Sequence, residues 1–227
     1  MTDHSGDEER VRIQARPYDW PHDGALSPAN TALVIIDMQN DCNVEGTRTA
    51  IPNIARLLAA FRAHDYPVYH TREGHRPELS TLTSRELYRS RHNATGLGIG
   101  DPGPLGRLLI LGERGHDIVP ELCPRPSEPV IDKPGRSAFA YTDFELLLKV
   151  RGVAKLVVCG VTTDVCVHST MREGNDRGYE CLLVEDATGS VDEGLRRAAV
   201  DMVQIEGGIF GVVASTEEVL AGLAKRK

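Results

Sequence analysis

The sequence predicts a doubly wound, mostly parallel α/β sheet of about six strands in a three-layer arrangement. Two observations carry this prediction. Several short runs are apolar throughout, which fits strands buried on both faces, and these runs alternate along the chain with segments of helical spacing. The alternation is interrupted once, by a Gly-, Pro- and Arg-rich stretch over residues 72–128, expected to be an irregular insert with a turn of helix near 82–90. A chain of 227 residues suits a single domain.

The first part of the chain predicts an N-terminal arm and then the start of the domain. Residues 1–28 carry many charges and are expected to form an arm, ordered only if something docks it, ahead of one domain over residues 29–227. The run TALVIID (31–37) is apolar up to its last residue, which predicts a buried strand. The segment 53–64 has helical spacing, and PVYHT (67–71) predicts the next strand.

Strand and helix patterns alternate regularly after the insert. The expected strands cover 129–133, 154–160, 180–186 and 208–215. The expected helices cover 143–152, 164–177, 191–203 and 216–224. Repeated strand–helix units are typical of parallel sheets, because each helix returns the chain to the edge where the next strand begins.

Composition excludes several classes of function. Lys and Arg number 26 against 33 Asp and Glu, a net charge of −7, so neither nucleic acid nor an anionic membrane is an expected partner. No apolar run approaches the roughly 18 residues of a membrane span, and the first twenty residues lack the apolar core of a signal peptide. We therefore expect a soluble, cytoplasmic protein. Five cysteines without CxxC spacing argue against a disulfide framework or a structural zinc site.

Three reactive side chains fall at the carboxyl ends of predicted strands. Asp37 ends the first strand, Lys133 ends the third, and Cys166 starts the helix after the fourth. Ligands bind at this edge of doubly wound sheets, so the fold would bring the three together. Each residue alone has an ordinary alternative, since an Asp there caps helices, a Lys is solvated and a Cys packs. Their shared edge is what points to catalysis.

These residue types suit nucleophilic catalysis by a thiol. A helix N-terminus and a neighbouring cation lower a thiol's pKa, so Cys166 beside Lys133 is expected to ionise readily. Asp37 could accept the thiol proton and return it to a departing amine. The backbone N–H of Cys166 and one from the preceding turn would hold the oxyanion. Cys159 and Cys181 lie inside apolar strands, where burial raises the pKa and blocks access.

With these residues placed, the sequence resembles the isochorismatase-like cysteine hydrolases. The matching motifs are VIIDMQND (34–41), IDKPGRSAF (131–139) and CGVTTDVCVHST (159–170), within a similarity that runs from about Thr31 to Ser215. The resemblance implies a flavodoxin-like sheet, a homo-oligomer (dimer or tetramer), and an Asp base, a Lys and a Cys nucleophile at the three strand-end positions.

The resemblance also implies an oxyanion site. Members of the family hold a non-proline cis peptide ahead of the nucleophile, which would fall at Val161–Thr162. It would turn the Thr162 N–H towards the oxyanion, beside that of Cys166.

Several stretches look most like biuret hydrolase and its ureide-cleaving relatives. They are 70–80, 98–107, 162–189 and 207–211. This resemblance implies hydrolysis of a terminal C–N bond of a small ureide or amide with release of ammonia, with biuret giving allophanate. The alternatives are a related hydrolase of ureidoacrylate, N-carbamoylsarcosine or nicotinamide, and a non-catalytic binding or scaffold member of the fold.

Departures from the family pattern define further candidates. Cys42 stands where many relatives have Phe, and Glu206 where biuret hydrolases carry a pocket Gln. An ionised Glu206 in the pocket would favour neutral, N–H-rich substrates, because a carboxylate only accepts hydrogen bonds. Arg136 is a candidate to orient a carbonyl-rich substrate. Glu73 and His75 occupy two metal-ligand positions of nicotinamidases, but no further His follows, so neither a metal nor a cofactor is expected.

Overall fold

Six parallel strands form the central sheet of the computed structural model, which describes residues 11–42 and 45–225. The strands are β1 (Thr31–Ile36), β2 (Val68–Glu73), β5 (Val130–Lys133), β6 (Lys155–Val161), β7 (Glu180–Gly189) and β8 (Val212–Ala214). Their spatial order is β5-β2-β1-β6-β7-β8, and every neighbouring pair is parallel. The order reverses between β1 and β6, which is where doubly wound sheets open a crevice for ligands. The predicted fold class is confirmed.

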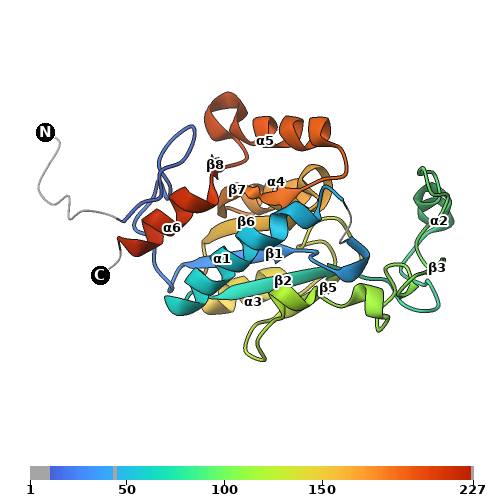
Figure 1. Cartoon of the computed structure of the whole chain (residues 1–227). Coiled ribbons are helices and arrows are strands. Elements are labelled where there is room, and N and C mark those ends of the chain that lie inside the picture. The colour runs from blue at the N-terminus through green and yellow to red at the C-terminus, as the bar shows by residue number, and fades with distance from the viewer. Residues whose placement is uncertain (1–10, 43–44, 226–227) are drawn as a thin grey trace, which may run out of the picture.

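Helices cover both faces of the sheet and complete the three layers (Figure 1). One layer holds α1 (Ile51–Ala63) and α6 (Thr216–Ala224), and the other holds α3 (Phe144–Arg151), α4 (His168–Asp176) and α5 (Glu193–Gly208). The side chains of β1 alternate between the two resulting cores. Leu33 and Ile35 pack with the first layer, whereas Ala32, Val34 and Ile36 pack with the second. Burial on both faces explains the continuous apolar run of this strand.

The last strand is shorter than expected, and the helix before it is longer. The sequence predicts a strand over 208–215, but α5 reaches Gly208 and β8 begins only at Val212. Glu206 and Gly207 already have positive φ, and Gly211 has a φ of 130°. A Cβ atom at Gly211 would collide with the Cys181 carbonyl, so the glycines here form a tight turn between helix and strand.

The described part of the N-terminal arm docks on its own chain. Ile13 and Trp20 are fully buried in the core of the α1–α6 layer. Arg16 and Val213 exchange two backbone hydrogen bonds of 2.9 and 2.8 Å, so the segment pairs with the edge strand β8. The arm therefore shields an edge that would otherwise expose unpaired backbone groups. Its first ten residues lie outside the described residues.

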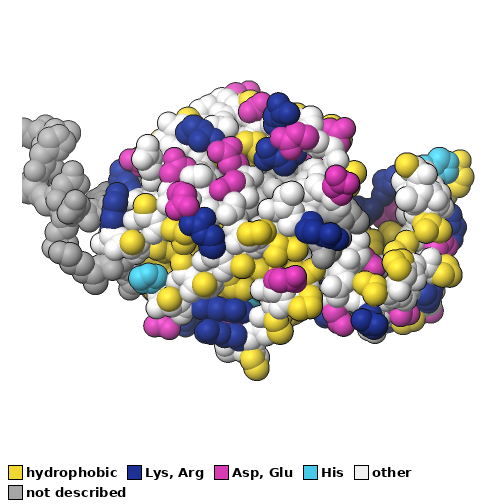
Figure 2. Space-filling view, viewed as in Figure 1, with side chains coloured by type: hydrophobic (Ala, Val, Ile, Leu, Met, Phe, Trp, Pro, Cys, Tyr) yellow, Lys and Arg dark blue, Asp and Glu magenta, His cyan; other side chains and the backbone are white. Residues whose placement is uncertain are grey.

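The insert over residues 72–128 leaves the sheet at the carboxyl end of β2. It contains α2 (Ser84–Ser90), capped by Thr83, and the two-stranded pair β3 (Pro102–Gly103) and β4 (Gly106–Arg107). Figure 2 shows this part as a knob projecting from the body of the molecule. It is tied back where the Leu109 N–H donates to the Asp41 carboxylate at 3.0 Å.

Among the described residues, no helix has the length and apolar character needed to cross a bilayer.

Candidate active site

The three strand-end residues meet at the carboxyl edge of the sheet. Asp37 follows β1 with a φ of 48° and is 2% exposed. Lys133 ends β5 and is fully buried. Cys166 lies in the wide helical turn Thr163–Val167 that connects β6 to α4, and it is 6% exposed. The sequence places each on a different element, and the order of the strands brings them to the same edge of the sheet.

Asp37 and Lys133 form a buried ion pair. Lys133 Nζ lies 2.7 Å from Asp37 Oδ2, and the Thr71 hydroxyl donates to Asp37 Oδ1 at 2.7 Å. Lys133 Nζ also donates to the Gly135 carbonyl at 3.0 Å. Burial raises the pKa of Asp37 above its ordinary value, and Lys133 offsets this only in part. Asp37 is therefore a stronger base than an exposed carboxylate.

The thiol of Cys166 is surrounded by more negative than positive charge. Reactive atoms of Asp37, Glu73 and Cys166 all lie within 4.8 Å of one another. Burial and then Asp37 raise the pKa of Cys166 well above its ordinary value, although Lys133 lowers it. The expectation of a readily ionised thiol is therefore wrong for the resting site. The first physical reason is burial of the thiol, and the second is the charge of Asp37, which offsets the ammonium that was expected to stabilise a thiolate.

Glu73 is the residue of this site that sequence reasoning placed in a different role. Cys166 Sγ donates to Glu73 Oε2 at 3.6 Å, and Lys133 Nζ lies 3.9 Å from the same oxygen. Glu73 is the last residue of β2, whereas the sequence predicts a strand that stops at Thr71. Because β2 lies between β1 and β5, a longer strand would have placed Glu73 between Asp37 and Lys133 from the outset.

The cluster of Asp37, Glu73 and Cys166 has donor atoms close enough to bind a metal ion. However, the Lys133 ammonium lies 2.7 Å from Asp37 and 3.9 Å from Glu73. A second cation among the same carboxylates would be repelled by this buried ammonium. The residues present therefore do not suit a metal, and metal-independent activity stays a prediction.

Cys42 and Arg136 lie near the triad. Cys42 is half-buried, and burial followed by the charges of Asp37 and Glu73 raises the pKa of its thiol. Arg136 is half-buried 3.7 Å from Glu86 of α2, and its charge contributes to lowering the pKa of Glu73. The charges of the site thus act on Cys42, and the charge of Arg136 acts on the site. Contact of either residue with substrate stays a prediction.

Glu206 lies at the opposite edge of the sheet within one chain. A helix that connects parallel strands runs from the carboxyl edge back to the amino edge, and Glu206 is in the last turn of α5, just before β8. It is exposed and has a φ of 52°. The expectation that it lines the pocket of its own triad is therefore not met by a single chain. A role for Glu206 in binding substrate would require a second copy.

The peptide bond between Val161 and Thr162 is cis, at the position that the family resemblance implies. It joins the end of β6 to the turn that carries Cys166. The Thr162 carbonyl accepts hydrogen bonds from the N–H groups of Val165 and Val167, so this turn is internally braced.

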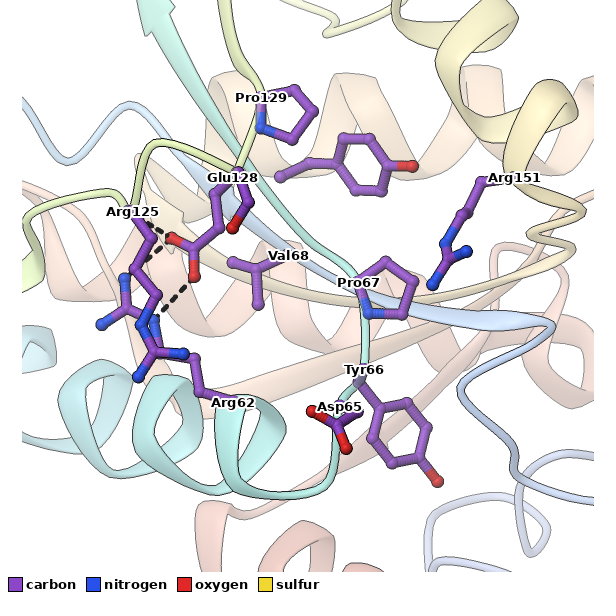
Figure 3. Close-up of a pocket in the computed structure, with 11 residues that line it drawn as sticks. Arg62, Asp65, Tyr66, Pro67, Val68, Arg125, Glu128, Pro129 and Arg151 are labelled. Atoms are coloured by element: carbon purple, nitrogen blue, oxygen red, sulfur yellow. Dashed lines mark hydrogen bonds and ion pairs between the residues drawn. The ribbon is translucent and has the colours of Figure 1, made fainter.

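A second cavity, of about 360 Å³, lies at the amino ends of β2 and β5 (Figure 3). Arg62 and Glu128 lie in contact at one side of it, with an Nε–Oε1 distance of 2.7 Å. His70 Nε2 lies 3.0 Å from the other oxygen of Glu128. This cavity is at the opposite edge from the triad, and Glu128 in its wall is paired with Arg62 and His70, so it is not the candidate active site.

The fold and the thiol–carboxylate–ammonium site define an α/β protein of the cysteine-hydrolase type. The chain belongs to the isochorismatase family, because the family's isochorismatase domain matches residues 31–218. A crystal structure of a cysteine hydrolase from Pseudomonas syringae pv. phaseolicola superposes with a TM-score of 0.74 at 26% identity, over 88% of this chain and 95% of that chain.

Curated relatives carry a more specific name. A ureidoacrylate amidohydrolase from Methylobacterium radiotolerans is 34% identical, over 96% of this chain and 88% of that protein. One from Azorhizobium caulinodans is 30% identical, over 91% of this chain and 97% of that protein. An N-carbamoylsarcosine amidase from Thermoplasma acidophilum shares the fold, with a TM-score of 0.64 at 20% identity, over 83% of this chain and 97% of that chain.

Proposed function

We propose that this protein is a cysteine-dependent amidohydrolase that cleaves a terminal C–N bond of a small ureide and releases ammonia. The observation that carries the proposal is the Lys133–Asp37 ion pair at 2.7 Å beside the Cys166 thiol. A base, a cation and a nucleophile in contact are the groups that acyl transfer through a thioester requires. Relatives that bear the name amidohydrolase support the same reaction class.

In the first half-reaction the thiol adds to the substrate carbonyl. Cys166 Sγ forms a bond to the carbonyl carbon while its proton passes to Asp37. Backbone N–H groups of Thr162 and Cys166 hold the oxyanion in this proposal. The oxyanion then collapses, the C–N bond breaks, and Asp37 returns the proton to the departing nitrogen. Ammonia leaves, and a thioester-type acyl-enzyme remains on Cys166.

In the second half-reaction water hydrolyses the acyl-enzyme. Asp37 accepts a proton from water, and the resulting hydroxide adds to the acyl carbon. The C–S bond breaks, and the sulfur recovers its proton from Asp37. Lys133 keeps its charge throughout and stabilises whichever of Asp37 and Cys166 is anionic. Biuret and water would thus give allophanate and ammonia, with no cofactor.

Two substrates have separate support. Biuret is favoured by the sequence stretches that resemble biuret hydrolases and by the charge of the site. Asp37, Glu73 and Lys133 sum to −1 around the thiol, which opposes an anionic substrate. Ureidoacrylate, an anion, is favoured by the names of the relatives, and Arg136, whose charge acts on Glu73, would then bind its carboxylate.

A substrate panel tests the proposal. Ammonia release would be measured with biuret, ureidoacrylate, N-carbamoylsarcosine and nicotinamide, before and after dialysis against a chelator. We expect release from a ureide, with biuret preferred and no effect of the chelator. Release from none of them would favour a non-catalytic binding member of the fold. Activity lost to the chelator and restored by zinc or manganese would require a metal in the mechanism.

A further inference from the structure

Glu73 reaches into the reacting centre, and neither half-reaction described above uses it. Its Oε2 lies 3.6 Å from Cys166 Sγ and 3.9 Å from Lys133 Nζ. It enters from β2, the strand that lies between those ending at Asp37 and Lys133. Any carbonyl carbon within bonding reach of the thiol therefore has a substituent close to this carboxylate.

Glu73 has more capacity to accept hydrogen bonds from a substrate than Asp37 has. Both oxygens of Asp37 are engaged at 2.7 Å, one by Lys133 and one by Thr71, and its side chain is 3% exposed. The contacts of Glu73 to Lys133 and Cys166 are longer, and its side chain is 14% exposed. A carboxylate offers about four lone-pair positions, so Glu73 retains acceptor positions that face the thiol.

The position of Glu73 is fixed by a buried neighbour. The Glu73 N–H donates to Gln39 Oε1 at 2.7 Å, and Gln39 Nε2 donates to the Glu73 carbonyl at 3.0 Å. Gln39 itself is fully buried. On the other side, His75 Nε2 lies 3.8 Å from Glu73 Oε1, and this ring is also fully buried. Groups held in this way are already oriented before a substrate arrives.

The pKa values of Asp37 and Glu73 are shifted in opposite directions. Burial raises the pKa of Asp37, and its partners do not fully offset that. Burial alone would also raise the pKa of Glu73, but His75, Lys133 and Arg136 together lower it below the ordinary value. Paired carboxylates with separated pKa values commonly divide their roles, one carrying the proton and the other staying charged.

We propose that Glu73 is a second catalytic carboxylate, which accepts hydrogen bonds from the amino group that leaves the substrate. This inference rests on the amidohydrolase function proposed above. With its N–H groups held by Glu73, the leaving nitrogen directs its lone pair at Asp37, which gives it the proton as the C–N bond breaks. An ester has no N–H on its leaving atom, so Glu73 selects amides and ureides over the corresponding esters.

A matched pair of substrates tests this selection. Biuret and methyl allophanate share one acyl group, from which ammonia leaves in biuret and methanol in the ester, so release of methanol is the measure of ester cleavage. Glu73→Gln removes the charge and keeps the size of the side chain, Glu73→Asp keeps the charge, and Glu78→Gln changes an exposed carboxylate of the insert as control. For Glu73→Gln we expect kcat/KM for biuret to fall about 10- to 100-fold, the range of a hydrogen bond to a charged group. We expect kcat/KM for methyl allophanate to change no more than in the control, and Glu73→Asp to recover part of the biuret activity.

A second measurement needs no substrate. Glu73 contributes to raising the pKa of Cys166, so Glu73→Gln should move the pH profile of Cys166 alkylation by iodoacetamide to lower pH. Mass spectrometry of the Cys166 peptide reads this directly, and Glu78→Gln should match the wild type. An unchanged alkylation profile, or equal losses on both substrates, overturns the role of Glu73 while ammonia release by the wild type leaves the amidohydrolase function standing. If the wild type releases ammonia from no ureide, the function itself fails, and the role of Glu73 with it.

Discussion

The Cys166 thiol keeps its proton at rest because burial and two carboxylates outweigh one ammonium. The nucleophile is therefore generated only when its proton moves to Asp37, whose raised pKa makes that transfer less uphill than to an ordinary carboxylate. A resting thiol of this kind is also less exposed to oxidation than a free thiolate, since the thiolate is the reactive form.

Cys166→Ser should fold normally and lose turnover. A hydroxyl beside Asp37 is far harder to ionise than a thiol, so the first bond to the carbonyl carbon does not form. Ammonia release with the preferred ureide measures the loss, and the melting temperature checks the fold. Cys123→Ser, at an exposed thiol, is the matched control and should retain activity. Full turnover by Cys166→Ser would remove Cys166 as nucleophile.

The ion pair should be as necessary as the thiol. Asp37→Asn removes the proton carrier, and Lys133→Ala leaves Asp37 a buried, uncompensated charge. We expect each to reduce kcat by at least roughly 10²- to 10⁴-fold, the usual effect of losing general acid–base catalysis or charge stabilisation. Steady-state kinetics on the variants decides this, with circular dichroism to show that each still folds. Wild-type kcat in either variant would mean that the triad must be redrawn.

The pH dependence of kcat/KM should show an acid limb set by the raised pKa of Asp37. The base must be ionised to accept the thiol proton, so activity is present above the pKa of Asp37 and is lost as pH falls through it. Because burial raises that pKa, the acid limb should lie above the roughly 3.9 of an ordinary Asp. The measurement is the pH dependence of kcat/KM, which reports the pKa values of groups in the free enzyme. An acid limb at or below the ordinary value would contradict Asp37 as the base.

Single residues show where sequence reasoning succeeds. The meeting of Asp37, Lys133 and Cys166 was predictable because each lies at or just after the end of a predicted strand, and parallel strands bring their carboxyl ends together. Glu73 was not, because β2 runs two residues beyond its apolar part, through Arg72 and Glu73, which are only half-buried. The thiol's pKa was predicted with the wrong sign, because the sequence does not show how deeply Cys166 is buried or that Asp37 offsets the Lys133 charge.

At the scale of elements, a group of paired charged side chains at the amino ends of β2 and β5 connects these strands to α1. Arg62 of α1 donates to both oxygens of Glu128 at 2.7 Å, and His70 of β2 contacts the same carboxylate. Burial would raise the pKa of Glu128, but Arg62, His70 and the Arg125 N–H lower it to about 2. Burial lowers the pKa of His70, more than Glu128 raises it.

These shifts predict loss of stability in acid. Glu128 stabilises the folded state fully above its ordinary pKa of 4.5, and this contribution is lost as pH falls towards about 2. His70 acts in the same direction below its ordinary 6.5, because the folded state resists its protonation. Glu128→Gln should be less stable than wild type at pH 7 and should lose less between pH 5 and 3. Urea unfolding at each pH measures this, with Glu121→Gln as an exposed control. Parallel curves for wild type and Glu128→Gln would contradict the assignment.

Element boundaries were predictable where the periodic pattern stops at a clear end signal. They were not predictable where the backbone conformation of several glycines sets the boundary. The predicted helix over 143–152 ends at Gly152, and α3 is followed there by this glycine in the left-handed conformation. The apolar residues of 208–215 predict a strand over this whole segment, yet positive φ at Gly208 and Gly211 makes its first part a turn. The docking of Ile13 and Trp20 was also beyond prediction, because a sequence does not show what a charged segment packs against.

At the scale of the whole molecule, the two cores cover both faces of the sheet, but apolar side chains on and just after α5 remain exposed to solvent. They are Leu195, Met202, Ile205 and Ile209, with exposures of 56%, 39%, 45% and 47%. Leu195 and Met202 are two helical turns apart and lie on one side of α5, whereas Ile205 and Ile209 flank the turn in which the helix ends. Exposed apolar side chains gathered on one element commonly mark an interface between subunits.

We expect the protein to be a homo-oligomer, a dimer or a tetramer, that buries this side of α5. A second copy is the natural occupant, since the same apolar surface on both partners is self-complementary around a two-fold axis. Leu195→Glu with Ile205→Glu should reduce the mass measured by light scattering at micromolar concentration. Val150→Glu, at an 81% exposed apolar residue of α3, is the control and should leave the mass unchanged. A monomeric wild type would contradict this prediction and would also remove the one route by which Glu206, at the end of the same helix, could reach a triad.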